Sequence, residues 1–208
     1  MNGYLIKRLA TGAALAAALS LPHSYAQDHF EVVVYVHDDV PSNIATAPEG
    51  YFEPWQAEMA KIQPFPVRVE YRRNVPGVTD VQYQFHESQH ALDNFRNALR
   101  LHNDTHKNWG HPKRTKRLLL TGGNINEDTL GIAYVQGSIG IATTTAFAAP
   151  GHELGHILGA THEASEVLNN PWFCETYMIP SRFSLRSNCY RYSDENRARI
   201  SDYIHSLF

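Results

Sequence analysis

Cysteine and net charge are both scarce in this sequence, and each shortage excludes a class of protein. Two cysteines in 208 residues are too few for a small scaffold held together by disulfides. The 18 lysines and arginines are outnumbered by 21 aspartates and glutamates, so the chain lacks the basic excess of a nucleic-acid-binding protein. A hydrophobic fraction of 43% is too high for a disordered chain. The composition and length therefore predict one globular domain.

Long apolar runs are also missing, with one short exception near the N-terminus. Lys7 and Arg8 precede an apolar run from Leu9 to Leu21, and Ser24-Tyr25-Ala26 has the small-x-small pattern of a cleavage site. The run is too short to span a bilayer, which needs about 20 residues. We therefore expect residues 1–26 to be a cleaved signal peptide and residues 27–208 to form one domain without a membrane span. Such a protein is secreted or periplasmic.

The two cysteines have two alternative roles. Export would place Cys174 and Cys189 in an oxidising compartment, where a single disulfide between them is the simpler expectation. That bond would close a loop of about 16 residues and stabilise the fold by roughly 3 kcal/mol. Metal binding by the cysteines is the alternative, and the histidines described below are better ligands.

Apolar patterning along the chain predicts a mixed α/β order of elements. Runs of β-branched and alternating apolar residues predict strands, and a 3.6-residue apolar period predicts helices. Ser193 is the expected N-cap of a C-terminal helix. Strands are predicted at 31–36, 67–71, 117–121, 131–135 and 139–144, helices at 54–62, 88–103 and after Ser193, and a loop at 41–50.

Histidine, in contrast, is abundant, and three of the 12 histidines fall in the segment His152–His162, which reads HELGHILGATH. On a helix, His152 and His156 lie on one face a turn apart, so both imidazoles can reach one Zn²⁺ ion. Gly159 can adopt a positive φ, which ends the helix and turns the chain back. This turn would bring His162 to the metal as a third ligand.

This ligand set predicts a catalytic zinc ion rather than a structural one. Three neutral nitrogen ligands leave the fourth position open for water, whereas a structural site has four protein ligands. The metal lowers the pKa of water and polarises a carbonyl group. Glu153 is placed to act as the general base and to pass the proton to the leaving amine.

A second HExxH motif at residues 86–90 lacks the rest of this pattern. Asp93 and Arg96 stand where the longer motif has glycine and the third histidine. We expect His86 and His90 to face solvent at the start of the predicted helix. The short motif alone is weak evidence for a metal site, and the extended motif is strong evidence.

The extended motif resembles the signature of the metzincin zinc proteases. The segment Cys174–Pro180 is similar to the Met-turn of that family, in which Met178 would pack beneath the zinc ligands without binding the metal. Glu127–Val135 and Ser138–Ala142 are similar to strands of the adamalysin/reprolysin branch, which the chain resembles most.

The resemblance implies a fold, an activity and a set of binding residues. The fold is an α/β metzincin-like zincin domain with a twisted, mostly parallel sheet, an antiparallel edge strand, an active-site helix and a C-terminal helix. Residues 27–208 would be the catalytic domain of a secreted zinc metalloendopeptidase, a monomer that holds one Zn²⁺ ion and cleaves proteins or peptides. The peptide would pair antiparallel with the edge strand by β-augmentation. The substrate-binding residues are then Gly131, Ile132, Ala133, Ile179 and Pro180, the last two in the pocket for the residue after the cleaved bond.

Departures from the family pattern keep alternatives open. Glu163 stands where adamalysins carry aspartate, and Pro180 replaces the tyrosine ligand of astacins. Pro150 and Gly151 directly precede His152, which predicts a helix that starts late or kinks. The main alternative is an inactive zinc-binding protein that holds a protein partner in its groove. A zinc-stabilised adhesion or inhibitor domain is a third.

Overall fold

The computed structural model describes residues 29–106, 113–169, 172–181 and 185–208. The expected signal peptide at residues 1–26 lies outside these ranges. Within them, no helix combines the length and the apolar character needed to cross a bilayer.

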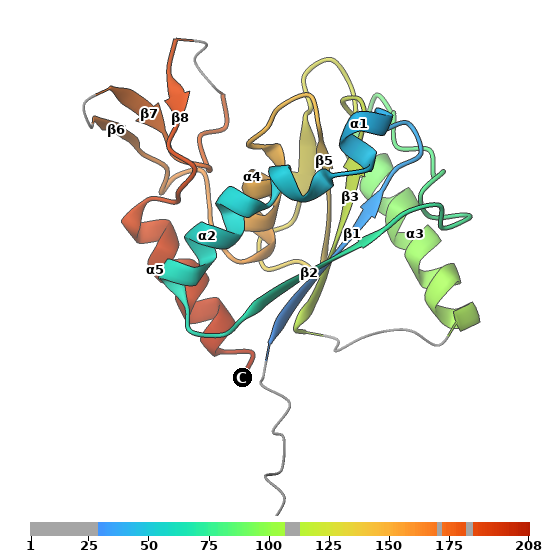
Figure 1. The fold of residues 1–208 in the computed structure, drawn as a ribbon, viewed down its shortest axis with the longest axis horizontal. Helices are drawn as coiled ribbons and strands as arrows, with labels where there is room; N and C mark the ends of the chain where they lie inside the picture. Colours follow the sequence, from blue (N-terminus) through green and yellow to red (C-terminus); the bar gives the residue numbers. More distant parts are fainter. Residues whose placement is uncertain (1–28, 107–112, 170–171, 182–184) are drawn as a thin grey trace, which may run out of the picture.

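A five-stranded sheet forms the centre of the domain (Figure 1). Its strands lie in the order β2-β1-β3-β5-β4, all parallel except β4, which pairs antiparallel with β5 at one edge. The antiparallel edge strand is thus confirmed. The bounds are β1 (Phe30–Val36), β2 (Val67–Arg72), β3 (Thr115–Thr121), β4 (Gly131–Ala133) and β5 (Ile139–Thr143).

Helices cover both faces of this sheet, which explains why its inner strands β1, β3 and β5 are almost entirely buried. Alternate residues of β1 point to opposite faces: Val32 and Val34 join one apolar core, and Val33 and Tyr35 join the other. α3 covers the Tyr35 face, and α2, α4 and α5 pack on the Val34 face (Figure 1). The bounds are α2 (Glu53–Ile62), α3 (Ser88–His106), α4 (Ala149–Ile157) and α5 (Asp194–His205).

The loop predicted at 41–50 is wrong, because this segment contains the short helix α1 (Ser42–Ala45) and the 3₁₀ helix η1 (Pro48–Tyr51). Each follows or begins with a proline, Pro41 at the N-cap of α1 and Pro48 in the first turn of η1. Proline fixes φ at a value that suits a helix start, so single helical turns form here without an apolar period.

A small second sheet was not predicted, because its strands are too short to show a period. It contains β6 (Val167–Asn169), β7 (Phe173–Glu175) and β8 (Ser187–Asn188) and lies near α5 (Figure 1). The predicted disulfide between Cys174 and Cys189 is formed and ties β7 to the chain after β8. The backbone N–H of Cys189 also donates to Glu175 O at 2.9 Å. The bond therefore closes the segment that contains Met178.

Replacing both cysteines with serine is expected to lower the free energy of unfolding by about 3 kcal/mol, because the unfolded chain regains the entropy of the open loop. For a domain of this size the loss corresponds to a fall in Tm of roughly 6–12 °C. Urea unfolding of the double variant, compared with the reduced and the oxidised wild-type protein, measures the effect. An unchanged midpoint in the variant would show that the loop closure contributes nothing.

Candidate metal centre

The helix α4 carries two of the predicted zinc ligands and ends where the sequence predicts. It begins late, at Ala149, and Pro150 lies in its first turn, where a missing N–H costs nothing. It ends at Ile157, and Gly159 then adopts φ +98°, a conformation that L side chains rarely take. The chain turns back at this glycine and returns to the helix at His162.

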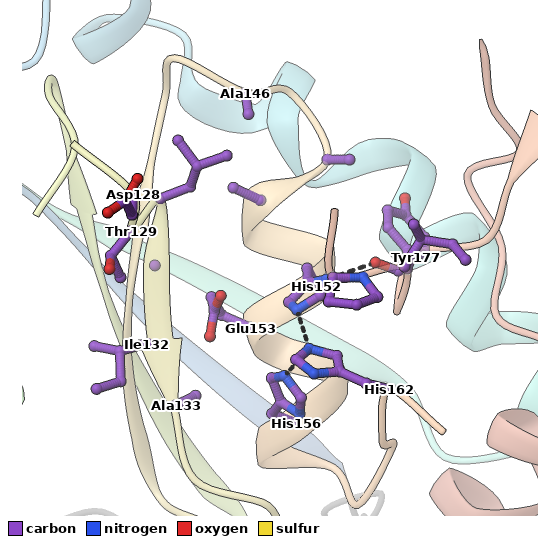
Figure 2. Close-up of a pocket in the computed structure, with 16 residues that line it drawn as sticks. Asp128, Thr129, Ile132, Ala133, Ala146, His152, Glu153, His156, His162 and Tyr177 are labelled. Carbon is purple, nitrogen blue, oxygen red and sulfur yellow. Dashed lines mark hydrogen bonds between the residues drawn. The ribbon is translucent and has the colours of Figure 1, made fainter. Parts of the chain in front are cut away.

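The three predicted ligands His152, His156 and His162 converge at one point (Figure 2). The Nε2 atom of His162 lies 2.9 Å from Nε2 of His152 and 3.0 Å from Nε2 of His156. In the described part of the chain, this is the only group of three or more histidine, cysteine or acidic side chains close enough together to hold a metal ion.

The protonation of these rings fits a cation at that point. Nδ1 of His152 donates to Tyr177 O at 2.7 Å, and Nδ1 of His156 donates to Ala160 O at 3.2 Å. Because a carbonyl oxygen only accepts, Nδ1 carries the hydrogen and Nε2 of each neutral ring has a free lone pair. Burial, with the neighbouring imidazoles, lowers the pKa of His152 to about 3, and burial also lowers the pKa of His156. Neutral imidazoles of this kind are the nitrogen ligands that zinc prefers.

Glu153 points from α4 toward β4, beside the three imidazoles (Figure 2). Its carboxylate is buried, and Oε2 has no hydrogen-bond partner among the described residues. Burial raises the pKa of Glu153 to about 8. A cation held by the imidazoles would favour the charged carboxylate and so oppose this increase. An unpartnered buried carboxylate oxygen is costly unless it has a functional partner, and a reacting water is one such partner.

Gly131 on β4 makes room for this carboxylate. A Cβ atom at position 131 would lie 2.7 Å from Oε1 of Glu153 and equally close to the backbone oxygen of Ile141. The sequence indicated Gly131 only as a substrate-binding residue. The structure gives it a second role, because any larger residue would displace the carboxylate.

A cavity of about 340 Å³ lies between β4 and α4, within the size range of small ligand sites. It is lined by the three histidines, Glu153 and all five predicted substrate-binding residues. Apolar side chains dominate the remaining lining, and Asp128 is the only other charged residue in it. The five substrate-binding residues are Gly131, Ile132, Ala133, Ile179 and Pro180.

Met178 is fully buried, packs against α4 at Gly155 and does not line the cavity. A Cβ atom at Gly155 would lie 2.5 Å from Sδ of Met178 and 2.7 Å from Cε1 of Tyr192. The ring of Tyr177 packs in the same way against Gly151, four residues earlier on the helix. The two glycines therefore form a flat strip on α4 against which these three side chains pack.

Gly155→Ala is expected to destabilise the protein by about 1–3 kcal/mol through overpacking, although alanine is the better helix former by about 1 kcal/mol. The added methyl group would meet the Met178 sulfur and the Tyr192 ring, both fully buried. Thermal unfolding of the variant measures the loss. A rise in Tm would show that the helix propensity of alanine outweighs the crowding of the added methyl group.

Several residues around the site have roles that the sequence did not indicate, although Tyr177 lies within the Met-turn segment Cys174–Pro180. Tyr177 supplies the carbonyl that orients His152, and its own side chain lines the cavity. Tyr192 and Asn196 contact the backbone of the ligand-bearing segments. The sequence did not predict these roles, and no local signal could have identified them.

The second HExxH motif does not form a site. The helix α3 begins at Ser88, so His86 precedes it and does not share a helix face with His90. The His86 side chain is 98% exposed and His90 is also exposed, as expected.

No protein-family model matches the sequence, and no curated protein sequence matches it. Solved structures do resemble the fold. Metalloproteinase-II from Bacteroides fragilis is 16% identical to this chain, with a TM-score of 0.62. The match covers 86% of this chain and 54% of the metalloproteinase, so this chain spans about half the length of that protein. The zinc-dependent peptidase of Methanocorpusculum labreanum (strain Z) is 15% identical with a TM-score of 0.50 over 81% of this chain and 99% of its own.

At these identities the likeness concerns the fold alone. The mostly parallel sheet, its antiparallel edge strand, the helix that carries HExxH and the C-terminal helix are the elements of the fold that the sequence predicted. The chain therefore has a metzincin-like zincin fold, which it shares with a solved metalloproteinase and a solved zinc-dependent peptidase.

Proposed function

We propose that this protein is a secreted zinc-dependent metalloendopeptidase. The observation that carries the proposal is one cavity that holds three convergent imidazoles and a buried carboxylate oxygen without a partner among the described residues. His152, His156 and His162 would hold one zinc ion. The likeness to solved zinc-dependent peptidases supports this assignment.

Bound zinc supplies Lewis acidity, which lowers the pKa of water and polarises the carbonyl of the scissile bond. Glu153 accepts the proton of the attacking water and then delivers it to the leaving amine. Tyr177 O and Ala160 O hold His152 and His156 through their Nδ1 hydrogens, which directs both Nε2 atoms inward. Met178 closes the floor beneath the ligands.

The substrate lies along β4, the terminal strand of the sheet, by antiparallel strand addition. Gly131, Ile132 and Ala133 supply backbone groups, and Ile179 and Pro180 form the pocket for the residue after the cleaved bond. The alanines at 146, 148 and 149 line the same cavity, and their small side chains leave it room for a bulky uncharged side chain. The similarity of Glu127–Val135 and Ser138–Ala142 to adamalysin strands supports that branch as part of the proposal.

The disulfide supports export to an oxidising compartment, secreted or periplasmic. The three imidazoles and the carboxylate of the site come from one chain, which supports action as a monomer.

Hydrolysis of unfolded casein by the purified protein tests the proposal. We expect cleavage that stops when a chelator removes the metal and returns when zinc is added back. Mass-spectrometric analysis of a peptide library should then show bulky uncharged residues after the cleaved bond. Zinc binding at a stoichiometry of one ion without any hydrolysis would refute the peptidase and support the alternative of a zinc-containing groove that binds a protein.

A further inference from the structure

The chain that leads into α5 contacts the metal centre at two separate points. Tyr192 and Asn196 are four residues apart, and neither side chain is exposed. Each is hydrogen-bonded to the backbone of a residue that directly precedes a zinc-binding candidate. Tyr192 contacts Gly151, before His152, and Asn196 contacts Thr161, before His162.

The hydroxyl group of Tyr192 has a fixed orientation. It accepts the indole N–H of Trp55 at 3.0 Å and lies 2.6 Å from Gly151 O. An indole nitrogen only donates and a carbonyl oxygen only accepts, so the hydroxyl hydrogen must point to Gly151. The ring also packs against the helix backbone at Gly155. Tyr192 therefore holds both turns of α4 that carry imidazoles.

The amide of Asn196 holds the third ligand's segment with a pair of hydrogen bonds. Its Oδ1 accepts the Thr161 N–H at 2.9 Å, and its Nδ2 donates to Thr161 O at 3.0 Å. Both backbone groups of the residue before His162 are thus satisfied by one side chain. This pairing fixes the amide orientation, because the reversed amide would place like groups together.

A rigid turn joins the two contacts. Ser193 is the N-cap of α5, and its Oγ accepts the Asn196 N–H at 3.1 Å. The same hydroxyl donates to Ala164 O, just after the third histidine. The backbone N–H of Tyr192 donates to the buried carboxylate of Glu58 at 3.0 Å. The short stretch 192–196 therefore sets the distance between α4 and the segment that leads to His162.

We propose that Tyr192 and Asn196 are positioning residues that clamp the two ligand-bearing segments at the spacing the metal requires. The inference rests on the proposed zinc centre. Neither side chain lines the cavity into which the three imidazoles point. They act through the peptide groups before His152 and His162, and so keep the third imidazole within reach of the first two.

Zinc affinity, measured by competition with a chromogenic chelator, tests the clamp without relying on activity. Tyr192→Phe and Asn196→Ala should each weaken zinc binding by about 10–100-fold, the usual effect of removing a group that orients a metal ligand. Asn196→Asp keeps the acceptor for the Thr161 N–H but places a second oxygen against Thr161 O, so its zinc affinity should fall at least as far as that of Asn196→Ala. The visible absorption bands of the Co²⁺-substituted variants should shift, because the ligand geometry changes.

Leu99→Ala is the matched control, since Leu99 is buried in the apolar core on the opposite face of the sheet. It should lower the urea midpoint as the clamp variants do and leave zinc affinity and the Co²⁺ spectrum unchanged. Clamp variants that lose stability but bind zinc like the wild type would overturn the proposal and leave these residues a purely structural role. A wild-type protein that binds zinc but cleaves no peptide would refute the proposed function, and the clamp would still be measured by affinity and spectrum.

Discussion

Glu153→Gln is expected to lower the rate of peptide hydrolysis about a hundredfold or more while zinc stays bound. The glutamine side chain has nearly the same shape but cannot accept a proton from water. The glutamine side chain fits the buried space that Glu153 occupies, because only one oxygen is replaced. The three imidazoles that we propose as metal ligands are untouched. The measurement is kcat/KM on a fluorogenic peptide, together with the zinc content of the purified variant.

The chain provides a matched control for this change in its second HExxH motif. Glu87 occupies the same position of that motif as Glu153 does in the first, and it is exposed. Glu87→Gln should hydrolyse peptide at the wild-type rate. If Glu153→Gln retained full activity with zinc bound, Glu153 would not be the base and the proposed mechanism would be wrong.

Glu58→Ala is expected to cost about 3–5 kcal/mol of stability, a larger loss than we expect for Gly155→Ala. Glu58 on α2 is fully buried and accepts a bidentate pair from Arg197 on α5, at 2.7 and 2.8 Å. It also accepts the Tyr192 N–H. Removing the carboxylate leaves the Tyr192 N–H without its acceptor and leaves Arg197 only its longer contact with Asp194, at 3.4 Å. It also removes the tie between α2 and α5.

Urea unfolding monitored by circular dichroism measures this loss. Glu53→Gln, an exposed change on the same helix, should have almost no effect on the midpoint. Replacing Glu58 and Arg197 together with methionine should recover part of the loss, because the Arg197 guanidinium group is then no longer left without its buried carboxylate partner. A wild-type midpoint for Glu58→Ala would mean that the ion pair contributes nothing to the packing of α5.

Local patterning predicted most of the large elements. The β-branched run at β1 and the apolar period of α3 are strong signals, because a strand buried on both faces and an amphipathic helix each impose a repeat on neighbouring residues. The strands β6, β7 and β8 have two or three residues each, which is too short to show an apolar repeat in the sequence. The prolines of segment 41–50 indicated a loop, and the structure shows that they begin two short helical turns instead.

Ligand spacing is a local property, so the sequence alone determined which residues can meet at the metal. A four-residue step on a helix places His152 and His156 on one face, and a glycine that tolerates a positive φ returns the chain at His162. Because both relations follow from backbone geometry within a few residues, they can be derived without knowledge of the remaining chain.

Only the tertiary structure decided what holds those ligands in place. Tyr192 lies 41 residues from its acceptor Gly151, Asn196 lies 35 from Thr161, and Glu58 lies 134 from Tyr192. A buried polar side chain must find a partner, but many backbone groups can serve, and the packing of α2, α4 and α5 selects one of them. For the same reason one HExxH motif forms a candidate metal centre in a cavity and the other faces solvent, although the two motifs are identical over their fixed positions.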